Sequence, residues 1–347
     1  MMRFQHETLG QRIVFAPGGA GEAVAQEVAR LGATRVMTIG TRAGTLTAGL
    51  PVVHRHDEVV MHVPVPVAAR ARAAAAACAA DVLVSIGGGS ATGLAKAVAL
   101  TTGLPIVAVP TTYAGSEATD VWGHTEAGHK TTGLHPAVLP RAVVYDATLT
   151  VSLPVGLSVA SGLNALAHCV DSMWAPRTDP IDMALAAEGI RALTTGLPLV
   201  ADDPAGLPGR EQALYGAYLS AVAFASAGSG LHHKICHVLG GRFDLPHAQT
   251  HAVVLAHVLA LNAPAAPAAA ARIAAAFGSD AALAGLQSLR QRLDAPRALR
   301  DLGLREDQLP AAVAAILPVV PPGNPAPVTA AVLHRLLHDA WEGTDPR

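Results

Sequence analysis

The chain has 347 residues, of which 51% are hydrophobic and 14% charged, and its formal net charge is −2. This composition excludes a disordered chain, which would combine low hydrophobicity with high net charge. The near-zero net charge also argues against a nucleic-acid partner, which would need a basic surface. The three cysteines, Cys78, Cys169 and Cys236, lie far apart and form no disulfide framework. Such cysteine usage is typical of a reducing compartment, so we expect a cytoplasmic protein.

The high hydrophobicity raises the question of a membrane span. The apolar stretches are interrupted by Lys96, His251, His257 and Pro264. They therefore fall short of the roughly 18–20 apolar residues that a spanning helix needs. The N-terminus has no apolar core followed by a small-residue cleavage site, so it does not predict a signal peptide. We expect no membrane partner.

The first half of the chain alternates short apolar runs with alanine-rich helical runs. Strands are predicted at 36–39, 81–86, 105–109 and 142–145. Uninterrupted apolar strands separated by helices are typical of a parallel sheet that is covered on both faces. The sequence thus predicts an α/β domain with a Rossmann-like sheet over residues 1–152.

The character of the sequence changes after Pro154. Long windows with few β-branched runs predict helices, and Thr329 is placed to begin a final one. We therefore expect an all-helical domain over residues 153–347. The helical windows are 156–176, 181–201, 209–229, 250–262 and 266–293.

Two turns follow neighbouring predicted strands. The first, Gly87, Gly88, Gly89 and Ser90, closes a strand and opens a helix, where glycines admit a phosphate and helix amides favour an anion. The second runs over 110–117 and is rich in threonine and glycine. Either turn alone could be an ordinary strand-to-helix connection. Together they predict a nucleotide-binding edge at the carboxyl ends of the strands.

Histidines are concentrated in the second half. Of the 16 histidines, six lie within residues 232–257. His233 and His237 are four residues apart and share a helix face, as do Asn164 and His168. One histidine on an apolar helix is usually structural, but several on converging faces favour a metal site or a proton relay.

These features together resemble the iron-containing (group III) alcohol dehydrogenase family, and within it the maleylacetate reductases. The resemblance covers almost the whole chain. It implies an α/β dinucleotide-binding domain followed by a helical substrate-binding and catalytic domain. The matching stretches are GGGSATGLAK (87–96), VPTTYAGSEAT (109–119), KTTGLHPAVLPRAVVYD (130–146), SGLNALAHCVD (161–171) and LHHKICHVLGGRFDLPHAQTHAVVL (231–255).

The resemblance implies NADH or NADPH as cofactor. Its diphosphate would bind at Gly87, Gly88, Gly89 and Ser90, its nicotinamide along Thr111, Thr112 and Ser116, and its ribose near Lys130. The predicted strand 36–39 is followed by Gly40, Thr41 and Arg42, with no acidic residue to read a ribose hydroxyl. Arg42 could instead bind a 2′-phosphate, so we expect both cofactors to work.

The resemblance also places four residues at the positions that bind metal in metal-using relatives: Asn164, His168, His233 and His247. His237 matches an additional active-site histidine. Asn164 is a neutral amide in place of a carboxylate and is a weak ligand for a hard divalent ion. We therefore expect no resident metal; if one is bound, His168, His233 and His247 would hold it.

The implied reaction is hydride transfer from NAD(P)H to the conjugated C=C bond of maleylacetate, an unsaturated oxo-dicarboxylate, giving 3-oxoadipate in aromatic-compound catabolism. The histidines would stabilise the oxyanion and His237 would donate the proton. Relatives of this kind are often homodimers. The sequence departs from the resembled pattern at His124, His129, Gly323 and Ala326, and no arginine follows Asn324 to bind a substrate carboxylate.

Three alternatives stay open. The first is a reductase of the same fold that acts on another small carbonyl or unsaturated acid. The second is a metal-dependent lyase similar to 3-dehydroquinate synthase, which would need a charged ligand at position 164. The third is a binding module that has lost its chemistry, against which the intact set of His168, His233, His237 and His247 argues.

Overall fold

The structure is a computed structural model that describes residues 3–40, 43–126 and 129–346. Its contacts divide the chain into two compact units. The α/β unit is Thr8–Leu153, and the helical unit is Pro154–Arg347 together with Met1–Glu7. The start of the chain thus packs with the helical unit, whereas the sequence places it in the first domain. The division into domains at residues 152 and 153 stays a prediction.

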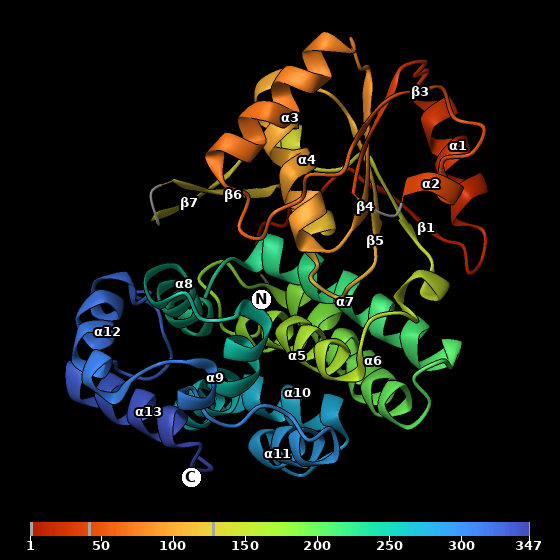
Figure 1. The fold of residues 1–347 in the computed structure, drawn as a ribbon. Coiled ribbons are helices and arrows are strands. Elements are labelled where there is room, and N and C mark those ends of the chain that lie inside the picture. Colours follow the sequence, from red (N-terminus) through yellow and green to blue (C-terminus); the bar gives the residue numbers. More distant parts are fainter. Residues whose placement is uncertain (1–2, 41–42, 127–128, 347) are drawn as a thin grey trace. The chain divides into compact units, whose positions relative to one another are not determined.

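The α/β unit is built on a parallel sheet of six strands (Figure 1). The predicted parallel architecture is confirmed, and its central strands are almost fully buried. Apart from Thr38 in β2 and Ser85 in β4 they are apolar throughout, because helices cover both faces of the sheet. Across the sheet the order is β1 (Arg12–Phe15), β8 (Ala142–Tyr145), β5 (Ile106–Pro110), β4 (Val82–Gly87), β2 (Val36–Ile39) and β3 (Val52–His56).

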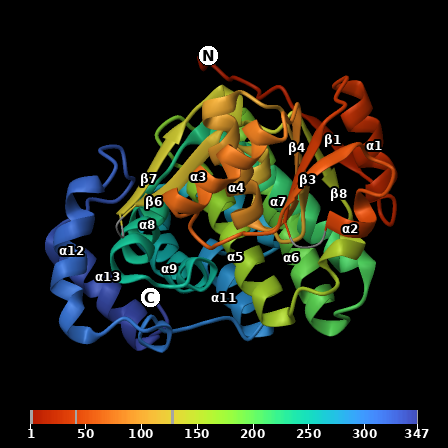
Figure 2. The same ribbon diagram turned by 45° about the horizontal axis from the view of Figure 1, so that its top comes forward.

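Helices lie on both faces of this sheet, with α1 on one and α3 and α4 on the other (Figures 1 and 2). Alternate residues of β4 illustrate the division: Val82, Val84 and Ile86 join the apolar cluster under α1, because successive strand side chains point to opposite faces. The helices are α1 (Ala20–Arg30), α2 (Ala43–Leu46), α3 (Val65–Ala77) and α4 (Gly89–Thr102).

The sequence did not predict three pieces of this unit. They are the edge strands β1 and β3 and an antiparallel hairpin of β6 (Val121–Glu126) and β7 (His129–Leu134). Each is short and half-exposed in its described residues. Such strands carry polar residues on their open side and lack the continuous apolar signal of a buried strand.

The helical unit contains nine α-helices among its described residues. The predicted window 266–293 is two helices, because Gly278 adopts a left-handed conformation (φ +67°) that ends α10. Thr329 begins the last helix as predicted: its side chain accepts a hydrogen bond from the Val332 amide. The helices are α5 (Val155–Ser172), α6 (Pro180–Asp202), α7 (Leu207–Ala227), α8 (Leu231–Phe243), α9 (His247–Asn262), α10 (Pro267–Phe277), α11 (Ala282–Arg292), α12 (Leu309–Ile316) and α13 (Ala330–Glu342).

A glycine seam joins α6 to α7, which run antiparallel. It consists of Gly189 and Gly196 on α6 and Gly209 and Gly216 on α7. A Cβ atom added to Gly196 would lie 2.8 Å from the Gly209 carbonyl oxygen, and one added to Gly216 would lie 3.1 Å from that of Gly189. The two backbones can approach so closely because glycine carries no side chain at these four positions.

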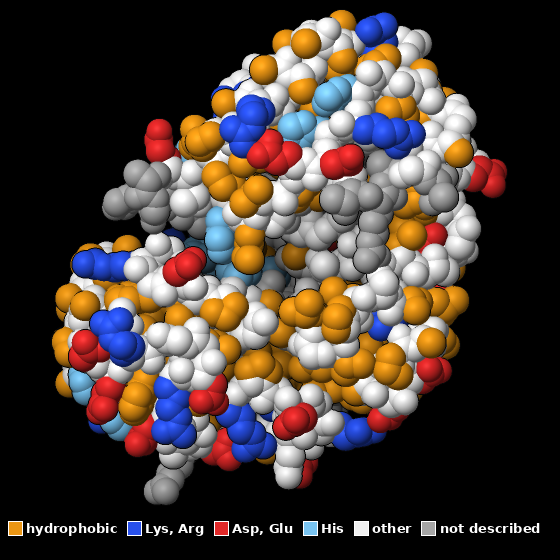
Figure 3. Space-filling model, viewed as in Figure 1, with side chains coloured by type: hydrophobic (Ala, Val, Ile, Leu, Met, Phe, Trp, Pro, Cys, Tyr) orange, Lys and Arg blue, Asp and Glu red, His pale blue; other side chains and the backbone are white. Residues whose placement is uncertain are grey.

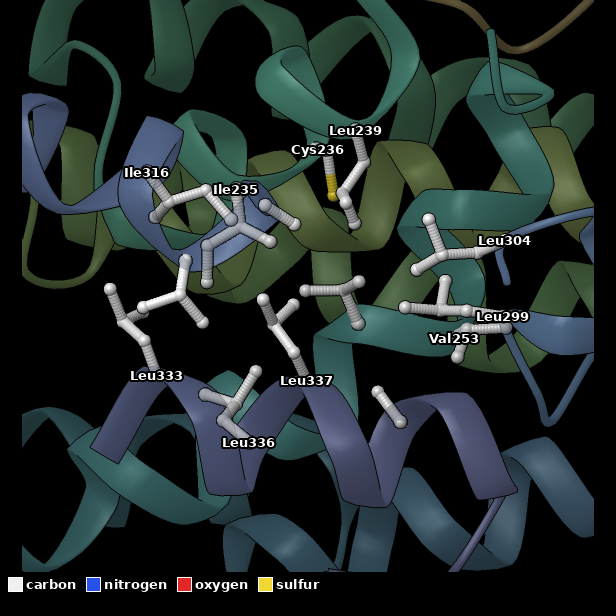
Figure 4. Packing of buried hydrophobic residues seen from close by; sticks show 14 of the residues in the cluster. Ile235, Cys236, Leu239, Val253, Leu299, Leu304, Ile316, Leu333, Leu336 and Leu337 are labelled. Carbon is white, nitrogen blue, oxygen red and sulfur yellow. The ribbon is translucent and has the colours of Figure 1, made fainter. Parts of the chain in front are cut away.

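Helix α8 has two faces of different chemistry. Ile235, Cys236 and Leu239 pack into the apolar core of the helical unit, against α9, α12 and α13 (Figure 4). The core also takes Leu333, Leu336 and Leu337 of α13, which share one face of that helix. The apolar face of α8 thereby fixes the rotation of the helix and with it the direction of its histidines.

The surface seen in Figure 3 mixes basic and acidic side chains across its described part rather than segregating them. Among the described residues, no helix is both long enough and apolar enough to cross a bilayer.

Candidate active site

The predicted phosphate turn lies where β4 meets α4. Gly87 ends the strand with a φ of +152°, and Gly88 precedes a helix whose first turn has no side-chain cap. Residues 87–90 are half-buried. An uncapped helix N-terminus offers backbone N–H groups and a positive dipole end to an anion. The turn therefore suits a diphosphate.

The second predicted turn lies directly beside the first, because β4 and β5 are paired with Gly87 opposite Pro110. Thr111, Thr112 and Ser116 are all half-buried. A Cβ atom on Gly88 would lie 3.0 Å from Cγ2 of Thr112, so the two turns are in contact only because residue 88 is glycine. The structure thus brings both halves of the predicted nucleotide site together.

Lys96 fixes the far end of the second turn, a function that the sequence did not predict. Its Nζ donates to the carbonyls of Thr119 and Val121 at 2.7 and 2.8 Å and to the Thr119 hydroxyl at 3.1 Å. Burial lowers the pKa of Lys96 to about 7. Because Lys96 lies on α4, this clamp ties the helix behind the glycine turn to the loop that follows β5.

Two expected cofactor residues cannot be placed as side chains. Arg42 lies outside the described residues. The backbone of Lys130 pairs with Thr125 in the β6–β7 hairpin, but its side chain is not among those described. Their roles stay predictions.

The histidines predicted from α5, α8 and α9 do converge. The ring of His168 on α5 stacks on that of His233 on α8, with centroids 4.8 Å apart and planes 13° apart. The His237 ring lies 6.1 Å from His233 and 6.5 Å from His247, which begins α9. Phe224 of α7 packs against both stacked rings. These four histidines are called the histidine cluster below.

Helix α5 contributes three polar residues to one face, because Asn164, His168 and Asp171 are four and three residues apart. Asp171 was missed as a functional residue. Its Oδ2 is hydrogen-bonded to Nδ1 of His233 at 2.7 Å and accepts from the Gly230 amide at 2.9 Å, and the side chain is fully buried. The helical spacing from His168 was the signal that could have found it.

Burial keeps the inner part of this cluster uncharged. It lowers the pKa of His168 to about 3 and that of His233 well below its ordinary value, and neighbouring imidazoles add to both effects. It raises the pKa of Asp171 to about 7. Both shifts within the Asp171–His233 pair favour a neutral pair over an ion pair. His237 is exposed and His247 half-buried, so these two line the outer side.

A second imidazole pair lies behind the cluster. Nε2 of His232 and Nδ1 of His251 are 2.8 Å apart, and the His251 ring lies 4.4 Å from that of His247. Both residues are buried, and desolvation lowers the pKa of each. The pair supports the inner histidines and stays neutral.

The positions that the resemblance assigns to a divalent ion leave three buried atoms without a hydrogen-bond partner among the described residues: Oδ1 of Asn164, Nδ1 of His168 and Nε2 of His233. Asn164 supplies no negative charge, and the nearly parallel rings of His168 and His233 direct their in-plane lone pairs along separate planes. Among the described residues, His168, His233 and His247 form no group whose donor atoms all lie within 4.8 Å of one another. A structural zinc site needs about four ligands converging at about 2.0–2.3 Å.

Four positions depart from the resembled pattern. His124 stacks on Trp122, with ring centroids 5.1 Å apart. Near Gly323 and Ala326, Asn324 forms a reciprocal amide pair with Asn262 at 2.8 and 3.0 Å, and its Nδ2 also donates to the Ala326 carbonyl. This stretch therefore holds the chain against α9. The side chain of His129 is not among those described.

The family models decide the relationship. The model "Iron-containing alcohol dehydrogenase" matches residues 10–147, and "Fe-containing alcohol dehydrogenase family, C-terminal" matches residues 158–341. The chain belongs to the iron-containing alcohol dehydrogenase family. The resemblance stated from the sequence motifs is thereby confirmed, as is the fold that it implied.

Individual relatives within this family agree over their whole lengths. The chain is 44% identical to the maleylacetate reductase of Sphingobium indicum over 99% of both chains. The crystal structure of an iron-containing alcohol dehydrogenase from Corynebacterium glutamicum is 57% identical, covers 100% of this chain and 99% of its own, and has a TM-score of 0.98. That of maleylacetate reductase from Agrobacterium tumefaciens is 42% identical over 100% of both chains, with a TM-score of 0.94.

Proposed function

We propose that this protein is an NAD(P)H-dependent oxidoreductase that reduces the C=C bond of maleylacetate and releases 3-oxoadipate. One observation carries the proposal: relatives named maleylacetate reductase are 41–44% identical over at least 99% of both chains. The structure supports it with a glycine turn suited to a diphosphate and a cluster of uncharged hydrogen-bonding side chains.

The cofactor supplies hydride to the carbon beta to the ketone. Gly88 and the uncapped start of α4 would bind the diphosphate, and Thr111, Thr112 and Ser116 on the adjoining turn would contact the nicotinamide half. The sequence after β2 has no acidic residue, so a 2′-phosphate meets no repulsion there. NADH and NADPH should therefore both serve.

Negative charge then develops on the ketone oxygen as an enolate. Neutral imidazoles and amides stabilise such an oxyanion by donating N–H groups to it. His168 and Asn164 are neutral, buried and on one face of α5. An amide at position 164 can donate to the enolate, whereas a carboxylate would repel it. Asn164 thus suits enolate stabilisation better than metal binding.

His233 changes its role with the protonation of Asp171. When Asp171 is ionised, Nδ1–H of His233 donates to it, and Nε2 can only accept. When Asp171 is protonated, it can donate to Nδ1, and the proton on Nε2 becomes available to the oxyanion. Burial raises the pKa of Asp171 to about 7, which brings the second form within reach at neutral pH.

The alpha carbon of the enolate must then receive a proton. His237 is the exposed member of the histidine cluster and can exchange protons with water. An imidazole has the ordinary pKa range of a general acid near neutral pH. We assign the proton donor to His237 and infer that the reaction needs no resident metal, on the strength of the neutral amide and the parallel rings described above.

We further place the protein in the cytoplasm as a homodimer. Its three cysteines are free thiols, which is usual in a reducing compartment. The sheet ends in the edge strand β1, where Phe15 is 42% exposed. An uncovered edge with an apolar side chain is a surface that a second copy can cover. Light scattering during gel filtration tests the dimer.

Turnover tests the proposed activity. Purified protein with maleylacetate should consume NADH and NADPH, seen as loss of reduced-nicotinamide absorbance, with 3-oxoadipate as product by mass spectrometry. EDTA treatment should leave the rate unchanged. Absence of turnover with both cofactors would refute the substrate, and turnover that EDTA abolishes and zinc or iron restores would refute metal independence.

His237→Ala tests the proton donor in the same assay. We expect the turnover number to fall by roughly two orders of magnitude or more, which is the usual contribution of a general acid, while the affinity for NADH stays the same. Lys234→Ala, which changes a residue three positions before His237 on helix α8, is the matched control. An equal loss in the control, or a large loss of NADH binding in His237→Ala, would contradict the assignment.

A further inference from the structure

The side chains of His6, Asp179 and Asp182 meet at the start of α6, in the helical unit. Nδ1 of His6 lies 2.8 Å from Oδ2 of Asp179 and 3.7 Å from Oδ1 of Asp182. The three side chains are 7%, 3% and 0% exposed, and their donor atoms all lie within 4.8 Å of one another. None of the three belongs to the histidine cluster.

Asp179 serves as the N-cap of helix α6. Its Oδ1 accepts from the amides of Ile181 and Asp182 at 2.7 and 2.9 Å, which caps the N-terminus of α6. The cap fixes the carboxylate plane and leaves Oδ2 directed at His6. Oδ2 lies at hydrogen-bond distance, 2.8 Å, from Nδ1 of His6, and a cation bound by both residues would replace that hydrogen bond.

Asp182, in contrast, caps no helix. Its carboxylate oxygens accept no hydrogen bond of good geometry within the described part of the chain, although the Ser226 hydroxyl lies near enough to interact with them. Its side chain is fully buried. Buried polar groups are nearly always hydrogen-bonded, and an ionised carboxylate without a close partner is unfavourable in the interior. Burial raises the pKa of Asp182, so the ionised carboxylate beside His6 and Asp179 is stabilised only if a positive charge lies next to it.

A divalent cation of the zinc class supplies that charge with the right geometry. Bonds of about 2.0–2.1 Å in a tetrahedral site separate the ligand atoms by about 3.3 Å, between the two distances to His6. The Ser226 hydroxyl, 3.4 Å from Nδ1 of His6, offers a fourth oxygen, directly or through water. An imidazole among the ligands favours zinc over calcium or magnesium, which prefer oxygen alone.

We propose that His6, Asp179 and Asp182 bind a zinc-class divalent cation that fastens the start of the chain to helix α6. The ion is structural, because the two carboxylates come from one helix and the imidazole from the N-terminal segment. It explains why the first seven residues pack with the helical unit although the α/β unit follows them in the chain. The proposal is independent of the reductase activity.

Zinc binding by the full-length protein tests the proposal. Zinc chloride should raise the midpoint of thermal unfolding, because an ion that binds only the folded state stabilises it. Zinc affinity by calorimetry should fall by about tenfold or more in His6→Gln and in Asp182→Asn, since each removes one ligand. Replacing zinc by cobalt should give visible absorption bands that both substitutions weaken.

His338→Gln is the matched control. It removes an imidazole from a surface pair on α13, whose rings lie 6.3 Å apart and could take up zinc adventitiously. The proposal requires that this variant retains the zinc response. If His6→Gln and Asp182→Asn respond to zinc as the parent protein does, the three residues form an ion pair only.

Anomalous diffraction from crystals grown with zinc keeps the test decisive if a variant fails to fold. A peak among His6, Asp179 and Asp182 supports the site in the parent protein without any substitution. Density there without an anomalous peak, or peaks confined to other histidines, overturns the proposal.

Discussion

At the scale of single residues, the helical unit keeps its reactive side chains uncharged. The rings of His168 and His233 stack, Asn164 is an amide, and Asp171 is buried against the Gly230 amide. Low polarity opposes every charged form in this region. These uncharged side chains suit the proposed reaction, in which transient negative charge is stabilised by neutral N–H groups.

Substitution of Asp171 tests whether its protonated form matters. Asp171→Asn can keep a donor for Nδ1 of His233 but then loses the acceptor for the Gly230 amide, because both groups contact the same atom, Oδ2. Turnover should therefore fall, but by less than in a variant with no polar group. Asp171→Leu can neither donate nor accept, and turnover should fall by roughly two to three orders of magnitude. Steady-state kinetics with circular dichroism as a folding control decide this. Equal losses in both variants would show that the ionised carboxylate is the working form.

Asn164→Asp should introduce the negatively charged oxygen ligand that the amide of Asn164 does not provide. A carboxylate beside His168 and His233 adds a charged oxygen ligand, so the affinity for zinc should rise by at least about tenfold. Because an enolate would be repelled, turnover without metal should fall. Calorimetry in a His6→Gln background separates this site from the one proposed at α6. No gain in affinity would show that residue 164 does not face the two histidines productively.

At the scale of elements, two turns and one lysine organise the nucleotide site. Gly88 allows the turn after β4 to touch Thr112 after β5, and Lys96 of α4 holds the backbone at Thr119 and Val121. The apolar strands and the glycine run predicted that the two turns adjoin, which the pairing of β4 with β5 confirms; that they bind a nucleotide stays a prediction. The lysine clamp was not predictable, because a lysine inside an alanine-rich helix gives no sign of which carbonyls it will meet.

Gly88→Val should separate these two turns. The first added carbon would lie 3.0 Å from Cγ2 of Thr112, and the branched carbons beyond it would occupy the space at the start of α4. NADH affinity by fluorescence titration should fall by about tenfold or more, as expected when backbone approach to a diphosphate is blocked. Gly10→Val is the control, because no atom lies within 4 Å of its added carbon. Undiminished binding would refute the diphosphate assignment.

At the scale of the whole molecule, the sequence predicted the fold class because its strongest signals are local. Buried strands such as β4 and helices such as α13 appear in the sequence with their bounds shifted by one or two residues. The edge strands β1 and β3 were missed because half-exposed strands carry weak patterns. The convergence of His168, His233 and His247 needed a family resemblance, since nothing local relates α5 to α9.

Buried histidines should make the protein sensitive to acid. His257 on α9 is 5% exposed, and burial lowers its pKa from 6.5 to about 4. As the pH falls, His257 is therefore protonated in the unfolded chain before it is protonated in the folded protein. The stability that neutral His257 contributes is complete above about pH 6.5 and is lost between about pH 6.5 and pH 4, up to about 3 kcal/mol.

His257→Gln should accordingly reduce the fall in free energy of unfolding between neutral and acid pH. Urea titrations at several pH values measure it, with the exposed His334→Gln as the control. Some dependence of the free energy of unfolding on pH will remain in this variant, because desolvation also lowers the pKa of four other histidines: His168, His232, His233 and His251. An unchanged slope in His257→Gln would mean that this imidazole is hydrated in the folded protein.

The glycine seam between α6 and α7 has a consequence for how this protein can vary. Its contacts recur at seven-residue intervals on both helices, from Gly189 to Gly196 and from Gly209 to Gly216. A methyl group at Gly196 would lie 2.7 Å from the Ala213 nitrogen and 2.8 Å from the Gly209 carbonyl oxygen, and no rotation of a side chain can move these backbone atoms away. The helices would have to part along their common length, which would shift both Asp182 at one end of α6 and Phe224 on α7. Sequence variation in α6 and α7 is therefore confined to the faces that point away from the seam. New side chains in the helical unit are more easily accommodated on its other helices.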